Sequence, residues 1–484
     1  MMKQLTLTLI AAGVLSGCSM APKYVRPDAP VAADYPQHAA AAADQQQRVA
    51  ELGWRNFFPD QRLQALIGRA LENNRDLRVA ALRIEEARAL YNIQAADRLP
   101  HFDATATGNR GRTPASLSQT GTSVVGSNYQ VGLSLASFEL DFFGRVKSLS
   151  DAALASYLAT EEARQAAQIS LVAEVAKAYL AERAYTEQQE LAQRTLESRS
   201  KAYDLARQRF EVGASSALDL QQNQALMQTA RVQQLAMARQ RAQAWNALTL
   251  LVGQPLNDLP DPQPLSSQNI VTELPAGLPS DLLTQRPDIR SAEQTLLAAN
   301  ANIGAARAAF FPRISLTAGV GTASNTLDGL FESGSRAWSF TPQLVLPIFH
   351  AGANVANLNL TEVRKNIAVA NYEKSIQTAF REVADALVAR GLLEEQIDAQ
   401  QQVQDAQAQR LKLADQRFEN GIASSLDVLD AQRELFSAEQ ELVQARLLRL
   451  TNAVDLYRSL GGGILENTAT AAATPAAPVA APAQ

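Results

Sequence analysis

The stretch Gln208-Arg209-Phe210-Glu211-Val212-Gly213 recurs 208 residues later as Gln416-Arg417-Phe418-Glu419-Asn420-Gly421. Leu218-Asp219 is repeated as Leu426-Asp427 at the same offset. The offset also relates three pairs of glycines, which are Gly144 and Gly352, Gly213 and Gly421, and Gly253 and Gly461. A repeat of this size indicates an internally duplicated chain whose two halves build equivalent elements.

Both halves contain an unusually long stretch that predicts a helix. No Gly or Pro lies between Gly144 and Gly213, and only Gly391 interrupts the equivalent stretch before Gly421. Ala, Gln, Glu, Leu and Arg, which favour helices, dominate both. At 1.5 Å per residue each helix would be about 100 Å long, which requires packing like that of a coiled coil. We expect a partner helix after each (214–252 and 422–460) and another before each (about 63–98 and 281–310).

The segments between Pro100 and Gly144 and between Pro312 and Gly352 have a different period. Apolar residues alternate there with small or polar ones, as in Ile314-Ser315-Leu316-Thr317. Period two predicts strands, so we expect one two-stranded hairpin in each half, long enough to cross a bilayer when tilted. Strands of a soluble sandwich are the alternative, which an apolar face carrying Trp338 and Phe340 disfavours. Tyr129 and Trp338 are candidate anchors at the membrane interface.

The two copies differ in length by four residues. Pro100 and Pro312 are 212 residues apart, as are Asp76 and Asp288, whereas the glycine pairs are 208 apart. The difference therefore falls in or near the hairpins, and we expect it in their outer tips (about 111–127 and 322–336), where insertions are best tolerated.

Four strands do not close a barrel, because the smallest transmembrane barrels use about eight. No run of about 20 apolar residues follows the N-terminal segment, so a mature chain that crosses a membrane must do so as a closed barrel. We therefore expect an α+β membrane protein: a trimeric 12-stranded β-barrel, with four strands from each chain, continuous with a long α-helical barrel.

The N-terminus has the features of a bacterial secretory signal. Lys3 precedes an apolar run that leads to Leu15-Ser16-Gly17-Cys18, and Cys18 is the chain's one cysteine. This ending resembles a lipobox, which predicts a signal peptide over 1–17 and lipidation of Cys18 by a diacylglycerol thioether and an N-acyl chain. An ordinary signal peptide is the alternative. Ser19, with no Asp after the cysteine, resembles lipoproteins sent to the outer membrane.

The sequence predicts five segments. A lipid-anchored lead and equatorial segment (18–61) follows the signal peptide, and a disordered Ala/Pro/Thr-rich tail (464–484) ends the chain. Repeat 1 covers 62–260 with its hairpin at 100–143, and repeat 2 covers 261–463 with its hairpin at 312–351. Trp54, Phe57 and Phe58 are expected to pack in the core rather than to form a ligand site.

Composition favours neither nucleic-acid binding nor catalysis. The formal charge is −5, from 44 basic and 49 acidic residues without a basic stripe. His38, His101 and His350 are too scattered to suggest a metal site. Phosphate loops and nucleophile elbows are absent from the sequence. We expect no enzyme, no metal and no cofactor.

The chain resembles the TolC/OprM-type outer-membrane factors, the exit ducts of tripartite efflux pumps and secretion systems, and is most similar to the lipoprotein branch that serves resistance-nodulation-division pumps. The matching stretches are Gly53–Phe58, Asn74–Arg78, Phe138–Arg145, Leu278–Leu283, Arg286–Asp288, Ala301–Arg307 and Leu456–Gly463. The resemblance implies a homotrimer in the outer-membrane lipid with a large periplasmic portion. It also implies a periplasmic adaptor and an inner-membrane pump as partners, and drugs, solvents or other toxic small molecules as cargo.

The candidate gate is the start of the last predicted helix. Asp427 and Asp430 are three residues apart and share one helix face, so a trimer would place rings of carboxylates around its axis. The resemblance implies that Leu426 and Asp430 are constriction residues, that Asp427 matches the second aspartate of such tips, and that Arg433 ties neighbouring helices. It further implies that the adaptor contacts the turns at Gly213 and Gly421.

The first copy supports two interpretations of these residues. It retains Leu218 and Asp219, so Asp219 and Asp427 can be helix caps rather than gate residues. It has Gln222 and Ala225 where the second copy has Asp430 and Arg433. This asymmetry favours a specialised gate, although an exposed ion pair remains the alternative. Phe210 and Phe418 are expected to pack beneath the turns.

Three functions remain in view. The first is the passive efflux duct. The second is a periplasmic scaffold lipoprotein without a pore, which the predicted hairpins disfavour. The third is an envelope hydrolase, for which the sequence offers no nucleophile.

Overall fold

The computed structural model describes residues 19–32, 35, 49–119, 121–271, 274 and 281–468. It divides into two compact units. The first contains Met1–Asp28, Leu82–Glu161 and Ser291–Glu373, and the second contains Ala29–Ala81, Glu162–Arg290 and Lys374–Gln484. The predicted signal peptide and Cys18 lie outside the described residues, as do residues 469–484 of the predicted tail.

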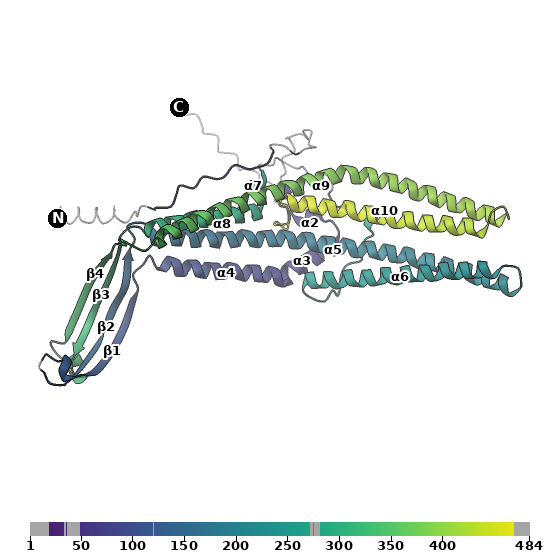
Figure 1. The fold of residues 1–484 in the computed structure, drawn as a ribbon. Coiled ribbons are helices and arrows are strands. Elements are labelled where there is room, and N and C mark those ends of the chain that lie inside the picture. Colours follow the sequence, from purple (N-terminus) through teal and green to yellow (C-terminus); the bar gives the residue numbers. More distant parts are fainter. Residues whose placement is uncertain are drawn as a thin grey trace, which may run out of the picture. The chain divides into compact units, whose positions relative to one another are not determined.

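The two long predicted helices are present and equal in length. Helix α5 covers Arg145–Glu211 and α9 covers Ala353–Glu419, 67 residues each. Gly391 lies inside α9 without interrupting it. The partners are α6 (Ala217–Val252) and α10 (Ser425–Ser459), so the second unit contains two antiparallel helical hairpins, α5–α6 and α9–α10 (Figure 1).

The helix expected before each hairpin of strands is broken, which corrects the prediction of single helices over 63–98 and 281–310. In the first half α3 (Gln61–Asn73) ends before α4 (Arg75–Ala96), and in the second α7 (Leu282–Gln285) ends before α8 (Pro287–Ala308). The breaks fall at Asn74 and Arg286, which are equivalent positions of the repeat. Pro287 disfavours a helical conformation at Arg286. The Asn74 side chain accepts from Leu77 N at 2.9 Å and so caps α4.

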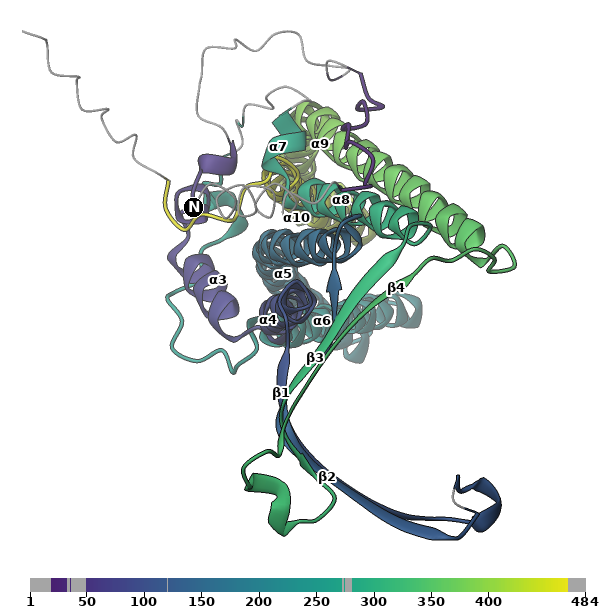
Figure 2. The same cartoon turned by 90° about the vertical axis from the view of Figure 1, so that its left-hand side faces the viewer.

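The four predicted strands form one antiparallel sheet in the first unit. Strands β1 (Phe102–Thr113), β2 (Val124–Leu140), β3 (Arg313–Ser324) and β4 (Arg336–Val345) follow each other in that order. The two predicted hairpins are thus joined by pairing of β2 with β3. The strands curve along their length (Figure 2), and β1 and β4 are the two edges of the sheet.

The four-residue difference lies in the returning strands, so its predicted place in the outer tips is wrong. The tips, 114–123 and 325–335, differ by one residue, and both are shorter than predicted. Strand β2 has 17 residues and β4 has 10. Strand β2 also carries a β-bulge between Leu135 and Phe138, where Ser137 has φ 41°. Bulges accommodate extra residues and bend a strand.

An aromatic core in the second unit surrounds α2 (Trp54–Phe57). Trp54 is 1% exposed and Phe57 and Phe58 are fully buried, which confirms that they pack in the core. The ring of Phe57 stacks on that of Tyr457 with 3.9 Å between the centroids. Single 3-10 turns occupy Val49–Glu51, Ala115–Leu117, Leu265–Ser267 and Asp328–Phe331.

The start of the predicted tail is bound to this core, which corrects the boundary at 464. The backbone N–H groups of Trp54 and Arg55 donate to the carbonyls of Leu465 and Glu466, at 2.9 and 3.0 Å. Arg55 also pairs with the Glu466 carboxylate at 2.7 Å. Residues 464–468 are therefore held against the N-terminus of α2, and supply acceptors for its free N–H groups.

The described part of the lead runs along α8 in the first unit. The Arg26 guanidinium donates to both carboxylate oxygens of Glu293, at 2.7 and 2.8 Å, and the Tyr24 hydroxyl donates to the same carboxylate. The backbone of Ala21 lies so close to Gly304 that a Cβ there would be 2.7 Å from Ala21 N. The lead is thus held against α8 at these points. Within the described ranges, no helix combines the length and apolar character needed to cross a membrane.

Candidate gate at the helical turns

The two turns that join the helical hairpins have the same backbone structure. Gly213 and Gly421 have φ values of 75° and 71°, the left-handed conformation that favours glycine at the end of a helix. Gly213 N donates to Phe210 O, and Gly421 N donates to Phe418 O, both at 2.9 Å. The repeated glycines of the sequence thus mark equivalent turns.

Helices α6 and α10 begin with identical capping boxes. Ser216 accepts from Asp219 N while the Asp219 carboxylate accepts from Ser216 N, and Ser424 and Asp427 do the same. Hydrogen bonds from the backbone N–H and the hydroxyl of Ser424 hold the pKa of Asp427 below its usual value. Asp427 is therefore a helix cap in this structure, and a gate role remains a proposal.

Asp430 is the centre of an ion-pair cluster that the first copy lacks. Its carboxylate accepts from Arg410 of α9 at 2.6 Å and from Arg433 of α10 at 2.5 Å. Arg433 also pairs with Glu434 at 2.9 Å. The side chains of Asp430, Arg410 and Arg433 are 35%, 48% and 65% exposed. The cluster thus links α9 to α10 next to the turn, and water screens it only in part.

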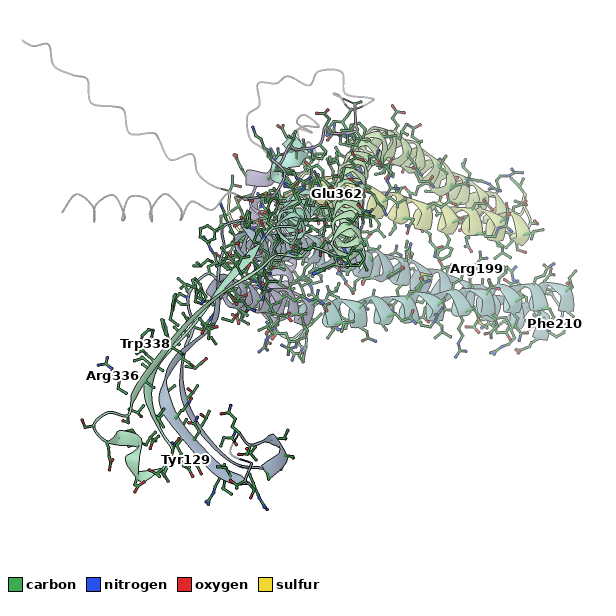
Figure 3. All side chains as sticks on the ribbon, turned by 60° about the vertical axis from the view of Figure 1, so that its left-hand side comes forward. Tyr129, Arg199, Phe210, Arg336, Trp338 and Glu362 are labelled. Carbon is green, nitrogen blue, oxygen red and sulfur yellow. The ribbon has the colours of Figure 1, made fainter. Side chains whose placement is uncertain are left out.

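Arg199 of α5 is a buried cation beside this cluster (Figure 3). It is 5% exposed, and its Nη2 donates to the Leu429 carbonyl of α10 at 3.0 Å. Its buried Nη1 has no hydrogen-bond partner. Burial, and then repulsion by Arg433, lower the pKa of its guanidinium. Arg199 is thus a contact between the two helical hairpins that depends on a single backbone carbonyl.

The apolar residues at the turns differ in burial. Leu426 is 61% exposed, as a residue that lines a passage must be, whereas Leu429 is 8% exposed. Phe210 is 41% exposed at the end of α5 (Figure 3), so the prediction that it packs beneath the turn is wrong for this residue. Phe418 is half-buried.

Sequence reasoning missed Arg410 and Arg199. Both have uncharged counterparts in the other copy, since Ala202 corresponds to Arg410 and Gln407 to Arg199. The same asymmetry that indicated Asp430 could therefore have found them. In the described part of the chain, no group of three or more His, Cys, Asp or Glu side chains could hold a metal ion.

Comparisons with known proteins agree with this architecture. The model of the family described as outer membrane efflux protein matches residues 66–254 and 278–462, one stretch in each half of the repeat. The solvent efflux pump outer membrane protein SrpC of Pseudomonas putida is 50% identical over 466 residues, which are 96% of this chain and 99% of that protein. OprJ, an outer membrane protein of Pseudomonas aeruginosa, is 50% identical over 94% of this chain and 95% of its own.

A solved structure extends the match to three dimensions. The open state of the Neisseria gonorrhoeae MtrE outer membrane channel has a TM-score of 0.85 at 43% identity, and the match covers 94% of this chain and all of that one. The family resemblance and the α+β fold predicted from the sequence are confirmed. With both halves of its repeat matched and nearly its whole length aligned, the chain belongs to the outer membrane efflux protein family.

Proposed function

We propose that this chain is the outer-membrane exit duct of a tripartite efflux pump, and that three copies form the duct. Toxic small molecules pass through it passively from the periplasm to the exterior, while an inner-membrane pump supplies the energy. As a member of its family the chain is an efflux component of the outer membrane with a periplasmic portion.

One observation carries the proposal: each chain holds a four-stranded sheet with two open edges, joined to helices of 67 residues. Strands β1 and β4 have every residue exposed, and an open sheet edge invites pairing with another chain through its unpaired N–H and C=O groups. Three copies supply twelve strands, which is enough to close a transmembrane barrel. The same three copies surround its axis with paired helices.

The names of the relatives suggest the cargo. Proteins 49–50% identical to this chain are named as outer membrane proteins of toluene, solvent and antibiotic efflux pumps. We extend this class of apolar or amphipathic toxic compounds to the present chain. The inner-membrane pump that would deliver them is of the resistance-nodulation-division type, and a periplasmic adaptor would contact the turns at Gly213 and Gly421.

The candidate gate consists of Leu426, Asp427, Asp430 and Arg433, extended by Arg410. In the trimer, exposed Leu426 would narrow the passage, and Asp430 would hold α9 and α10 together through its two arginines. Asp427 would shape the gate indirectly, by fixing the start of α10 through its capping box.

The lipid anchor would sit on Cys18, acylated after removal of residues 1–17. The binding of Arg26 and Tyr24 to Glu293 supports a fixed exit for the lead along α8. The apolar face of the sheet would add to the membrane affinity of this anchor.

Conductance in planar bilayers tests the duct and its gate together. Purified protein is expected to form channels of low open probability. Asp430→Ala should raise that probability, because it releases Arg410 and Arg433 from their shared partner, whereas Gln222→Ala at the equivalent position of the first copy should not. A protein that never conducts contradicts the duct, and an unchanged Asp430→Ala channel removes Asp430 from the gate.

A further inference from the structure

One face of the sheet is apolar, and it carries arginines toward the outer tips. Trp338, Phe340 and Leu344 of β4 are 77%, 58% and 63% exposed, and Val320 of β3 and Leu133 of β2 lie on the same face through direct pairing. The opposite face carries Gln130, Ser134, Ser339, Thr341 and Gln343. The apolar face is therefore the one that fits a lipid environment.

Three arginines continue this apolar face toward the outer tips. Arg336 is two residues before Trp338 on β4, so their side chains share a face (Figure 3). On β1, Arg110 lies two pairs beyond the pair formed by Gly108 and Tyr129, and Arg112 lies four pairs beyond it, so both share the face of Tyr129. At the β4 edge, Trp338 is thus followed toward the tip by Arg336. Near the β1 edge, Tyr129 of β2 is followed toward the tip by Arg110 and Arg112 of β1.

These arginines form no ion pair with an acid among the described residues. None of the three takes part in an ion pair, although Arg112 donates a 3.2 Å hydrogen bond to Ser123 Oγ. The tip 114–123 contains no Asp or Glu, and the sheet itself contains only Asp103 and Glu139. The tip 325–335 contains Asp328 and Glu332, but neither forms an ion pair with Arg336, and the Asp328 carboxylate accepts from Gly329 N at 3.1 Å. Asp103 lies on the opposite face, and Glu139 is occupied by Arg145 near the other end of β2.

We infer that Arg110, Arg112 and Arg336 bind the phosphate groups of a phosphorylated lipid headgroup in the outer leaflet. A guanidinium binds phosphate oxygens through two parallel hydrogen bonds, and the acyl chains would then lie along Trp338, Phe340 and Leu133. The inference rests on the membrane placement of the sheet proposed above. In the proposed trimer, β4 of one chain lies beside β1 of the next, so the arginines of the two edges gather at three seams.

Native mass spectrometry of the full-length protein in mild detergent tests the site. The probes are diphosphoryl lipid A, its dephosphorylated form and inorganic phosphate. The phosphorylated lipid is expected to bind and the other two are not. A cation near a lipid surface contributes about fivefold in affinity, so R336Q should weaken binding about fivefold and R110Q/R112Q/R336Q on the order of a hundredfold. R336K should restore most of the loss.

The matched control is R231Q/R239Q/R364Q, which removes the same charge from exposed helix surfaces and should bind like the natural protein. Equal weakening in the control overturns the site, and so does undiminished binding by R336Q. Competition by inorganic phosphate at the concentration of the lipid would show an anion site instead and overturn the lipid assignment. Conductance of the same samples is recorded separately, so that failure of the duct and failure of the lipid site are distinguishable.

Discussion

At the scale of single residues, a substitution of Arg199 is expected to affect the stability of the fold and the gating of the channel differently. Its buried guanidinium has one hydrogen bond, to Leu429 O, and one nitrogen without a partner. Burying a charge without an ionic partner costs free energy, so its replacement by apolar volume of similar size is neutral or stabilising. Arg199→Met is therefore expected to leave the free energy of unfolding unchanged or higher. It should also raise the open probability of the channel, because α10 loses its tie to α5.

Thermal denaturation and bilayer conductance measure the two effects, with Gln407→Met at the equivalent position as the control. A variant that is less stable and conducts like the natural protein would make Arg199 a packing residue only. A higher open probability without a loss of stability is what an ordinary structural role would not produce.

The repeat shows how far residues can be predicted without the structure. Asp430 and Arg433 were found because the first copy has Gln222 and Ala225 in their places. Arg410 and Arg199 carry the same signal but lie on other helices. Which residue of α5 or α9 faces α10 depends on how the helices are rotated against each other, and the sequence alone does not set that rotation.

At the scale of elements, helix and strand type could be predicted, but breaks and strand ends could not. The long helices and all four strands follow from periodicity and from the positions of glycine and proline. At the break, Asn74 caps α4 locally through Leu77 N, and its Nδ2 also donates to Leu251 O at 2.8 Å, a tertiary bond that no local pattern contains. Likewise, the bulged strand β2 contains the extra residues of the first copy, which the general tolerance of loops for insertions places in the tips.

A pair of glycines allows the close approach of β2 and β3. Gly132 and Gly321 are direct partners, and a Cβ on Gly321 would lie 2.1 Å from the backbone oxygen of Val131. Gly321→Ala is therefore expected to destabilise the sheet by about 1–3 kcal/mol, the usual cost of overpacking, and to reduce assembly. Gly319→Ala is the matched control, because its Cβ would meet only the movable Ser339 hydroxyl at 3.2 Å.

The yield of heat-modifiable oligomer on gels after refolding measures this effect. Equal yields for the two glycine variants would mean that β2 and β3 can move apart to accommodate the Cβ without loss of stability. The Gly132–Gly321 pair would then not determine the spacing of these strands.

At the scale of the whole molecule, family membership decides between the duct and a scaffold lipoprotein, while the chain's own sheet explains why one copy is insufficient. The sequence alone indicated four strands and hence an oligomer. It did not reveal that β2 and β3 pair, which leaves β1 and β4 as the edges that copies must share.

Disulfide crosslinking between the edges tests the shared barrel. Strands β1 and β4 are separated by β2 and β3 within one chain, so a cysteine on each cannot form a bond inside a chain. Cysteines scanned over Thr105, Thr107 and Asn109 of β1 against Ser339 and Thr341 of β4, all on the polar face, should crosslink between copies for the pairs in register. Denaturing gels are then expected to show species of two and three chains and none larger. The control pairs a cysteine at Thr107 with one at Gln130, which are partners within one chain and should yield monomers only. Monomers for every edge pair, or a ladder beyond three chains, would contradict a closed trimeric barrel.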